Sequence, residues 1–109
     1  MNETVIILRK CHVNSMYKGY HYIQDAVEIV VAKNEESGNV RMMKDVYPVI
    51  AEKYGTSPAN IEAAIRSAVE KCWKSNREYV QEILGYSTTK CPSNSEFLEA
   101  LIFYQKFVE

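Results

Sequence analysis

The chain has 109 residues, of which 47% are hydrophobic and 25% are charged, and this composition is typical of one folded domain with a single core. Its net charge of −1 excludes an overall positive field that would draw the protein to nucleic acid or membranes, although a local basic patch is still possible. The longest apolar run, Val5 to Leu8, is far too short to span a bilayer, and the chain does not begin with a signal-peptide pattern. We therefore expect a cytoplasmic protein that has no membrane partner.

The three cysteines, Cys11, Cys72 and Cys91, are widely spaced and odd in number. They form no C-x-x-C pair, and the adjacent Cys11 and His12 would not face one metal ion from a helix. We therefore expect free thiols in a reducing compartment, with Cys72 in the core and no metal site.

The first part of the chain predicts two helices and a loop. Residues 4–13 are rich in branched side chains, and because nothing else in the chain reads as a partner strand, we interpret them as a helix ended by Asn14 and Ser15. Residues 17–33 place apolar side chains at helical spacing and predict a longer second helix. The polar segment 34–39 contains a glycine and predicts a loop.

Two further helical patterns lie on either side of the short break Gly55-Thr56-Ser57. Gly55 suits the left-handed position just past a helix end, and Ser57 followed by Pro58 is a helix start signal. The outline is that of a helix-turn-helix, although an ordinary helical hairpin has the same pattern. The helix before the break is expected to bury Met42 or Met43, Val46, Val49, Ile50 and Tyr54. The helix after it carries one apolar stripe, formed by Ile61, Ala64, Ile65, Ala68, Val69 and Cys72.

The rest of the chain predicts two more helices. Trp73 is expected to anchor the core, and residues 78–84 form a short helix that ends at Gly85. Ser93 and Glu96 form a capping box that begins a last helix. That helix is apolar on more than one side, so the excess is either core or a partner surface. The sequence predicts an all-α domain, a compact bundle of about six helices.

Sequence patterns of catalysis and of cofactor binding are absent. The four glycines are isolated, which excludes a glycine-rich phosphate loop, and no HExxH, GxSxG or DxDxDG-type spacing occurs. Neither histidine has an acidic neighbour placed to orient a catalytic imidazole. We therefore expect no enzyme, no catalytic residues, no cofactor and no small-molecule substrate, unless a site is assembled from residues distant in sequence.

Five stretches that together cover most of the chain carry a family resemblance. They are KGYHYIQDAV at residues 18–27, VYPVIAEKYGTS at 46–57, IEAAIRSAVEKCW at 61–73, LGYS at 84–87 and PSNSEFLEAL at 92–101. In this order and at nearly this spacing, they resemble the DNA-binding effector domain of the master sporulation response regulator, the stage-zero sporulation transcription factor A family.

The resemblance implies a six-helix domain whose third and fourth helices form the helix-turn-helix. The fourth helix, at about Pro58 to Lys74, would be the recognition helix in the major groove. The implied partner is double-stranded DNA at short repeated boxes, often bound by two copies of the domain side by side. In the regulator the domain follows a receiver domain. Because Met1 stands only a few residues before the first expected helix, we expect a single domain over residues 1–109 without a receiver, either a free-standing relative or an excised effector domain.

The recognition helix departs from the family pattern, which reads approximately S-R-V-E-R-A-I-R-H-A-I-E. Asn60 and Ala63 stand where the pattern has arginines, and Ser67 stands where it has histidine. The segment from residue 42 to residue 74 contains five basic and four acidic residues, which gives it a net charge of +1. The candidate base-facing residues are Asn60, Glu62, Ala63, Arg66 and Ser67. The candidate phosphate contacts are Lys44, Lys53, Thr56, Ser57 and Lys74.

Two functions remain open. In the first, the chain is a sequence-specific DNA-binding transcriptional regulator with altered specificity. Asn60 would then bind adenine, Glu62 would accept a hydrogen bond from cytosine, and Arg66 would contact guanine or a phosphate. Ser57 and the helix N-terminus would hold another phosphate. Each residue also has a structural explanation, because Glu62 suits a first helical turn and Arg66 can pair with Glu62 or Glu70. In the second function, the chain is a protein-interaction module that does not bind DNA and pairs with itself or with a full-length regulator through the last helix.

Overall fold

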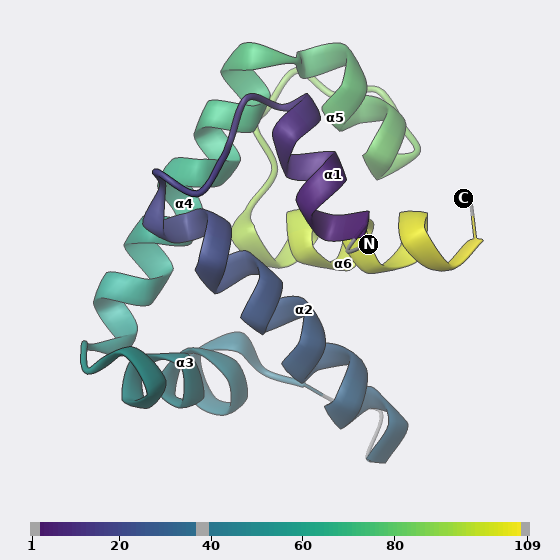
Figure 1. Ribbon diagram of the computed structural model, residues 1–109. Helices are drawn as coiled ribbons and strands as arrows, with labels where there is room; N and C mark the ends of the chain where they lie inside the picture. The colour runs from purple at the N-terminus through teal and green to yellow at the C-terminus, as the bar shows by residue number, and fades with distance from the viewer. Residues whose placement is uncertain (1–2, 37–39, 108–109) are drawn as a thin grey trace.

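Six α-helices and one π-helical turn make up the computed structural model, which describes residues 3–36 and 40–107 (Figure 1). The described part of the chain contains no strand, so the predicted all-α class is confirmed. None of its helices is both long enough and apolar enough to cross a membrane. The elements are α1 (Glu3–Lys10), α2 (Lys18–Glu36), η1 (Met42–Val46), α3 (Tyr47–Tyr54), α4 (Pro58–Ser75), α5 (Arg77–Leu84) and α6 (Asn94–Phe107).

Helix α4 is the central support of the bundle, because it contacts α2, α3, α5 and α6. It runs along one side of the molecule from α3 to α5, while α2 crosses it (Figure 1). Gly19 of α2 lies at this crossing. A Cβ atom added there would stand 2.4 Å from the carbonyl oxygen of Ala64 and 2.7 Å from the Cβ of Ala68. The absence of a side chain at Gly19 therefore allows α2 to approach the backbone of α4.

The apolar stripe of α4 forms the middle of the core, as the sequence predicted. Ala64 is half-buried, and Trp73 is buried as expected. The three thiols are free, and those of Cys11 and Cys72 are buried together, where a hydrogen bond between them and desolvation raise the pKa of Cys72. The buried members of the stripe are Ile61, Ile65, Ala68, Val69 and Cys72.

Two predicted helix ends are wrong. Helix α1 ends at Lys10 rather than near residue 13, because the chain turns where the N–H of Cys11 donates to the carbonyl of Leu8 and His12 adopts a positive φ of 65°. Helix α2 continues to Glu36, so the first three residues of the predicted loop 34–39 are helical. Glutamate is a good helix former, and a polar composition by itself does not end a helix. Residues 37–39 lie outside the described part of the chain.

The helix expected before the Gly55 break begins with the π-helical turn η1, in which the N–H of Tyr47 donates to the carbonyl of Met42. Pro48 follows directly, and in a regular helix its ring would clash with the carbonyl four residues earlier. The wider turn holds an extra residue and so rotates α3 relative to the expected stripe. The prediction that Val49 and Tyr54 are buried is therefore wrong, and Val49 is 50% exposed. Of the two methionines that the pattern offered, Met42 packs partly buried against the core and Met43 is exposed. The residues buried instead are Val46, Tyr47, Ile50 and Ala51.

The capping box at the start of α6 is confirmed. The N–H of Ser93 donates to Oε1 of Glu96 at 2.9 Å, and the N–H of Glu96 donates to Oγ of Ser93 at 3.2 Å. Hydrogen bonds from the backbone N–H of Ser93 and, second, from its side chain to the carboxylate hold the pKa of Glu96 below its ordinary value of 4.5. The ionised form of Glu96 therefore stabilises the folded state above that value, and the contribution is lost as the pH falls through the lowered pKa.

We expect Glu96→Gln to lower the melting temperature at neutral pH, because glutamine accepts the Ser93 hydrogen bond less strongly than a carboxylate does. The difference between wild type and variant should stay constant above about pH 5 and shrink as the pH falls below about 4. Thermal unfolding followed by circular dichroism over this range checks the prediction. A difference that does not change with pH would contradict it.

Candidate nucleic-acid interface

The turn between α3 and α4 fixes the direction in which α4 leaves the bundle. Gly55 adopts the left-handed conformation with φ of 66°, and the N–H of Thr56 donates back to the carbonyl of Ala51 at 2.9 Å. Oγ of Ser57 then accepts the N–H of Asn60 at 3.2 Å, which caps α4. Two helices thus meet across three residues, which is the arrangement of a helix-turn-helix (Figure 1).

Asp25 of α2 holds α3 in place, which the sequence did not predict. Its Oδ2 accepts the hydroxyl of Tyr54 at 2.7 Å, and its Oδ1 pairs with Nζ of Lys53 at 3.1 Å. The ring of Tyr54 also meets that of Tyr22 edge to face, with centroids 5.0 Å apart. The hydrogen bonds to Asp25 raise the pKa of both Lys53 and Tyr54. Lys53, a candidate phosphate contact, is therefore engaged by an acid of its own domain, although its side chain is 60% exposed.

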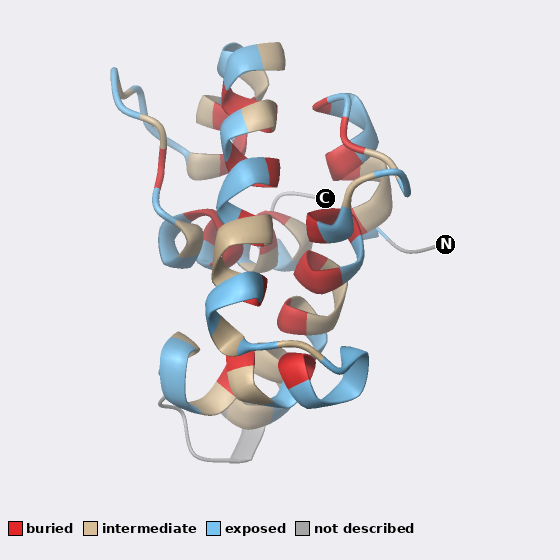
Figure 2. Ribbon diagram, turned by 90° about the vertical axis from the view of Figure 1, so that its left-hand side faces the viewer, coloured by how far each residue is buried: buried red, intermediate tan, exposed pale blue. Residues whose placement is uncertain are grey.

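The five candidate base-facing residues all lie on the outer side or the flank of α4. Asn60, Ala63 and Ser67 follow each other at helical spacing on the side opposite the buried stripe, where Asn60 and Ser67 are exposed and Ala63 is half-buried. Glu62 and Arg66 lie on the flank, where Glu62 is half-buried and Arg66 is exposed. Figure 2 shows the molecule from the side on which α4 lies in Figure 1, coloured by burial. Along the helices, buried residues alternate with exposed and intermediate ones.

Two side-chain pairs orient the polar groups of this surface. Nδ2 of Asn60 donates to Oγ1 of Thr56 at 2.8 Å, which directs the amide along the first turn of α4. Nη1 of Arg66 contacts both carboxylate oxygens of Glu62, one turn earlier. The ion pair that the sequence suggested as the structural role of Arg66 is therefore formed, and it neutralises the cation of this flank while no partner is bound.

Asn94 also holds α4, and sequence analysis noted it only as part of the capping-box stretch. From the first turn of α6, its Nδ2 donates to the backbone carbonyl of Glu62 at 3.1 Å and to the hydroxyl of Tyr47 at 3.3 Å. One amide thus joins α6, α4 and α3 at the height of the Glu62–Arg66 pair. A cleft of about 470 Å³ separates this flank from the segment before α6. No sequence signal identifies such a contact, because it joins residues 32 positions apart.

The candidate phosphate contacts are spread over η1, α3 and both ends of α4. Thr56 is half-buried and Ser57 is exposed at its N-terminus, and Lys44 is exposed on η1. Lys74 is exposed in the last turn, about 25 Å from Ser57 along the helix axis at a rise of about 1.5 Å per residue. The structure therefore does not bring all five together. Among residues 3–36 and 40–107, no three histidine, cysteine or acidic side chains gather closely enough to hold a metal ion.

The fold agrees with a comparison to known families. The sequence model of the family described as "Sporulation initiation factor Spo0A C terminal" matches residues 4–104. The match begins in α1 and ends in α6, so it includes the α3–α4 corner and every candidate residue on it. It covers all five stretches on which the resemblance was based.

Proposed function

The chain belongs to the family of Spo0A C-terminal domains, which are DNA-binding domains of a sporulation regulator, and we propose that it is itself a sequence-specific DNA-binding transcriptional regulator that uses α4 as its recognition helix. The observation that carries this proposal is the outer side of α4. It begins directly at the capped turn and presents polar or small residues, while the opposite side of the helix is buried in the core. A helix supported in this way enters a major groove without any rearrangement of the bundle.

The specificity should differ from that of the family pattern, because the outer row of α4 is uncharged. Asn60, Ala63 and Ser67 replace two arginines and a histidine. An asparagine amide pairs with the edge of adenine, whereas arginine prefers guanine, and each good bidentate contact contributes about 1–3 kcal/mol of discrimination. The Asn60 amide would have to exchange its bond to Thr56 for the base, and Thr56 would then be available to a phosphate oxygen.

The affinity should depend only moderately on salt. Lys53 and Arg66 are both paired with acids of the protein, so Lys44 and Lys74 are the remaining cations among the candidate contacts. Each phosphate neutralised by a cation contributes about −0.9 to the slope of log K against log salt concentration. Two such contacts predict a slope of about −2, which is shallow for a DNA-binding protein.

Selection from a random pool of duplexes, carried out with the full chain, tests this proposal. We expect one motif to be enriched, and fluorescence anisotropy with that duplex should give the shallow salt slope. Asn60→Ala should relax the preference at one base pair and leave the other positions unchanged. Failure to retain any duplex at low salt, with the variant and the wild type behaving identically, would contradict the proposal.

A further inference from the structure

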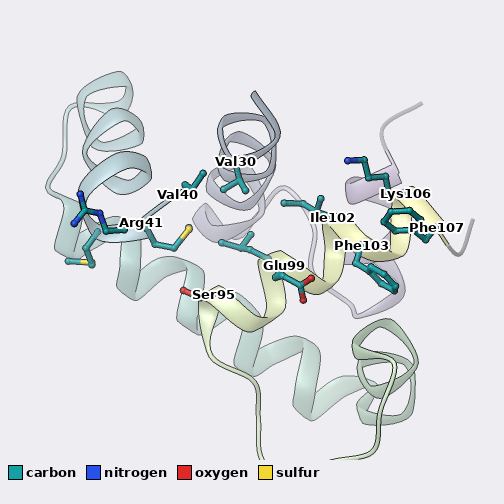
Figure 3. A pocket seen from close by; sticks show the side chains of 12 residues that line it. Val30, Val40, Arg41, Ser95, Glu99, Ile102, Phe103, Lys106 and Phe107 are labelled. Atoms are coloured by element: carbon teal, nitrogen blue, oxygen red, sulfur yellow. The ribbon is translucent and has the colours of Figure 1, made fainter. Parts of the chain in front are cut away.

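A groove of about 780 Å³ lies between three segments that are distant in sequence, namely the second half of α2, the start of η1 and one side of α6 (Figure 3). Its lining is mainly apolar. A cavity of this size, with an apolar lining and a few polar groups, is typical of a small-molecule site in a protein. The half-buried apolar residues that line it are Val30, Val40, Met42 and Ile102.

The two ends of the groove differ in charge. Arg41 lies at one end and Lys106 at the other (Figure 3). The Arg41 end has an acid beside it, because Oδ2 of Asp45 accepts the backbone N–H of Arg41 at 2.9 Å. Glu99 lies between the two ends, about 10 Å of helix rise before Lys106 (Figure 3). Within the described part of the chain Lys106 forms no ion pair, so its ammonium group is available to an anion.

We propose that this groove binds a free long-chain fatty acid, with the carboxylate beside Lys106 and the alkyl chain directed along α6 toward η1. Val30 and Ile102 contact the first part of the chain, and Val40 contacts the part beyond them. The chain ends at Met42 and Met43, whose flexible side chains adapt to alkyl chains of different lengths. No local motif indicates such a site, because its walls come from three separate segments.

The distribution of charge favours a fatty acid over other apolar occupants. The lining carries two cations, Arg41 and Lys106, and one acid, Glu99. Surfaces that bind anionic membranes carry clusters of about 4–8 lysines and arginines, so this face is a poor match for a lipid bilayer. A fully apolar ligand would leave the ammonium group of Lys106 without a partner. A long apolar lining with one available cation at its end matches an amphipathic anion that carries a single charge at its end.

Binding in the groove does not require DNA, and none of the residues that line the groove belongs to α4. The fatty acid would contact α2, η1 and α6 at once, so it should raise the melting temperature of the protein, as any ligand of the folded state does. This proposal and the proposed function can therefore fail independently of each other.

Isothermal titration calorimetry of the full chain with dodecanoate, kept below its micelle concentration, tests the proposal. We expect saturable binding of one molecule, with a negative change in heat capacity from apolar burial. From octanoate to dodecanoate the affinity should rise by up to about fourfold for each added methylene group. The absence of saturable binding would overturn the proposal, as would binding to phosphatidylglycerol vesicles without binding of free dodecanoate.

Lys106→Met tests the position of the carboxylate, because methionine removes the charge and keeps an apolar stem. The variant should bind dodecanoate about two- to fivefold more weakly, as for an exposed ion pair, and should bind 1-dodecanol as the wild type does. Lys90→Met, at an exposed position outside the groove, is the matched control and should bind both ligands normally. An unchanged affinity for dodecanoate, or an equal loss for both ligands, would overturn the proposal.

Ile102→Trp tests the position of the alkyl chain, because the larger ring occupies the middle of the groove. We expect the variant to lose measurable binding of dodecanoate, and circular dichroism should show the same helix content as in the wild type. A folded Ile102→Trp protein that binds dodecanoate as tightly as the wild type would place the ligand elsewhere and overturn the proposal. If this variant does not fold, the exposed Lys106→Met substitution still decides the question.

Discussion

Replacing Gly19 with alanine is expected to lower the free energy of unfolding by about 1–3 kcal/mol, the usual cost of overpacking. The added Cβ would stand 2.4 Å from the carbonyl oxygen of Ala64, which belongs to the backbone of α4 and cannot rotate away. In an open helix the same substitution stabilises by about 0.5–1 kcal/mol, because glycine loses more conformational freedom on folding. The sign of the change therefore reports whether α2 contacts α4 at this point.

Urea denaturation measures this difference directly. Lys18→Ala, at the exposed neighbouring position on α2, is the matched control and should change the free energy of unfolding by less than about 0.5 kcal/mol. A Gly19→Ala protein as stable as the wild type, or more stable, would show that the two helices do not cross as closely as described. Because α2 packs against the buried side of α4, the lower stability of Gly19→Ala should also reduce its apparent DNA affinity in proportion to the unfolded fraction.

Replacing Arg66 with alanine is expected to weaken binding to the selected duplex by about 5- to 150-fold, which corresponds to about 1–3 kcal/mol for one specific contact. Arg66 is the only arginine in residues 42–74, and it lies on the flank of α4 with its side chain 54% exposed. Binding to unrelated duplexes should fall much less. Fluorescence anisotropy titrations with the selected and the unrelated duplexes give the ratio of the two affinities for each protein. Arg9→Ala on α1 removes the same charge and serves as the control.

Glu62→Gln separates the two roles of the Glu62–Arg66 pair. In the free protein the carboxylate neutralises Arg66, so its removal should strengthen binding to any duplex and steepen the salt dependence. If Glu62 itself reads cytosine, the variant should lose discrimination at one base pair at the same time. A variant with unchanged affinity and unchanged salt dependence would place this flank away from the DNA.

Local signals in the sequence predicted the structure where one short stretch determines the outcome. The stripe of α4, the left-handed Gly55, the cap at Ser57 and the capping box at Ser93 each depend on neighbouring residues alone. The outer side of α4 follows from its buried side, so the candidate base-facing row could also be located from the sequence. The family match then identifies the chain as a member of a DNA-binding family, which the periodicity of its helices alone could not do.

The features that sequence reasoning missed depend on contacts between distant segments. Asp25 reaches Tyr54 across 29 positions, and Asn94 reaches Glu62 across 32 positions, so neither contact has a local pattern. The exposure of Val49 follows from the π-helical turn before Pro48, which breaks the regular period on which the expected stripe was based. The importance of Gly19 follows only from where α4 passes, because the glycine itself lies in an ordinary helix.

The central claim is that the outer side of α4 is the surface that meets DNA, and backbone amide chemical shifts recorded while the selected duplex is added test it most directly. The account predicts the largest shift changes at Thr56, Asn60, Ala63 and Ser67, with little change at Phe103 of α6. Large changes confined to α6, with the signals of α4 unmoved at saturation, would contradict it.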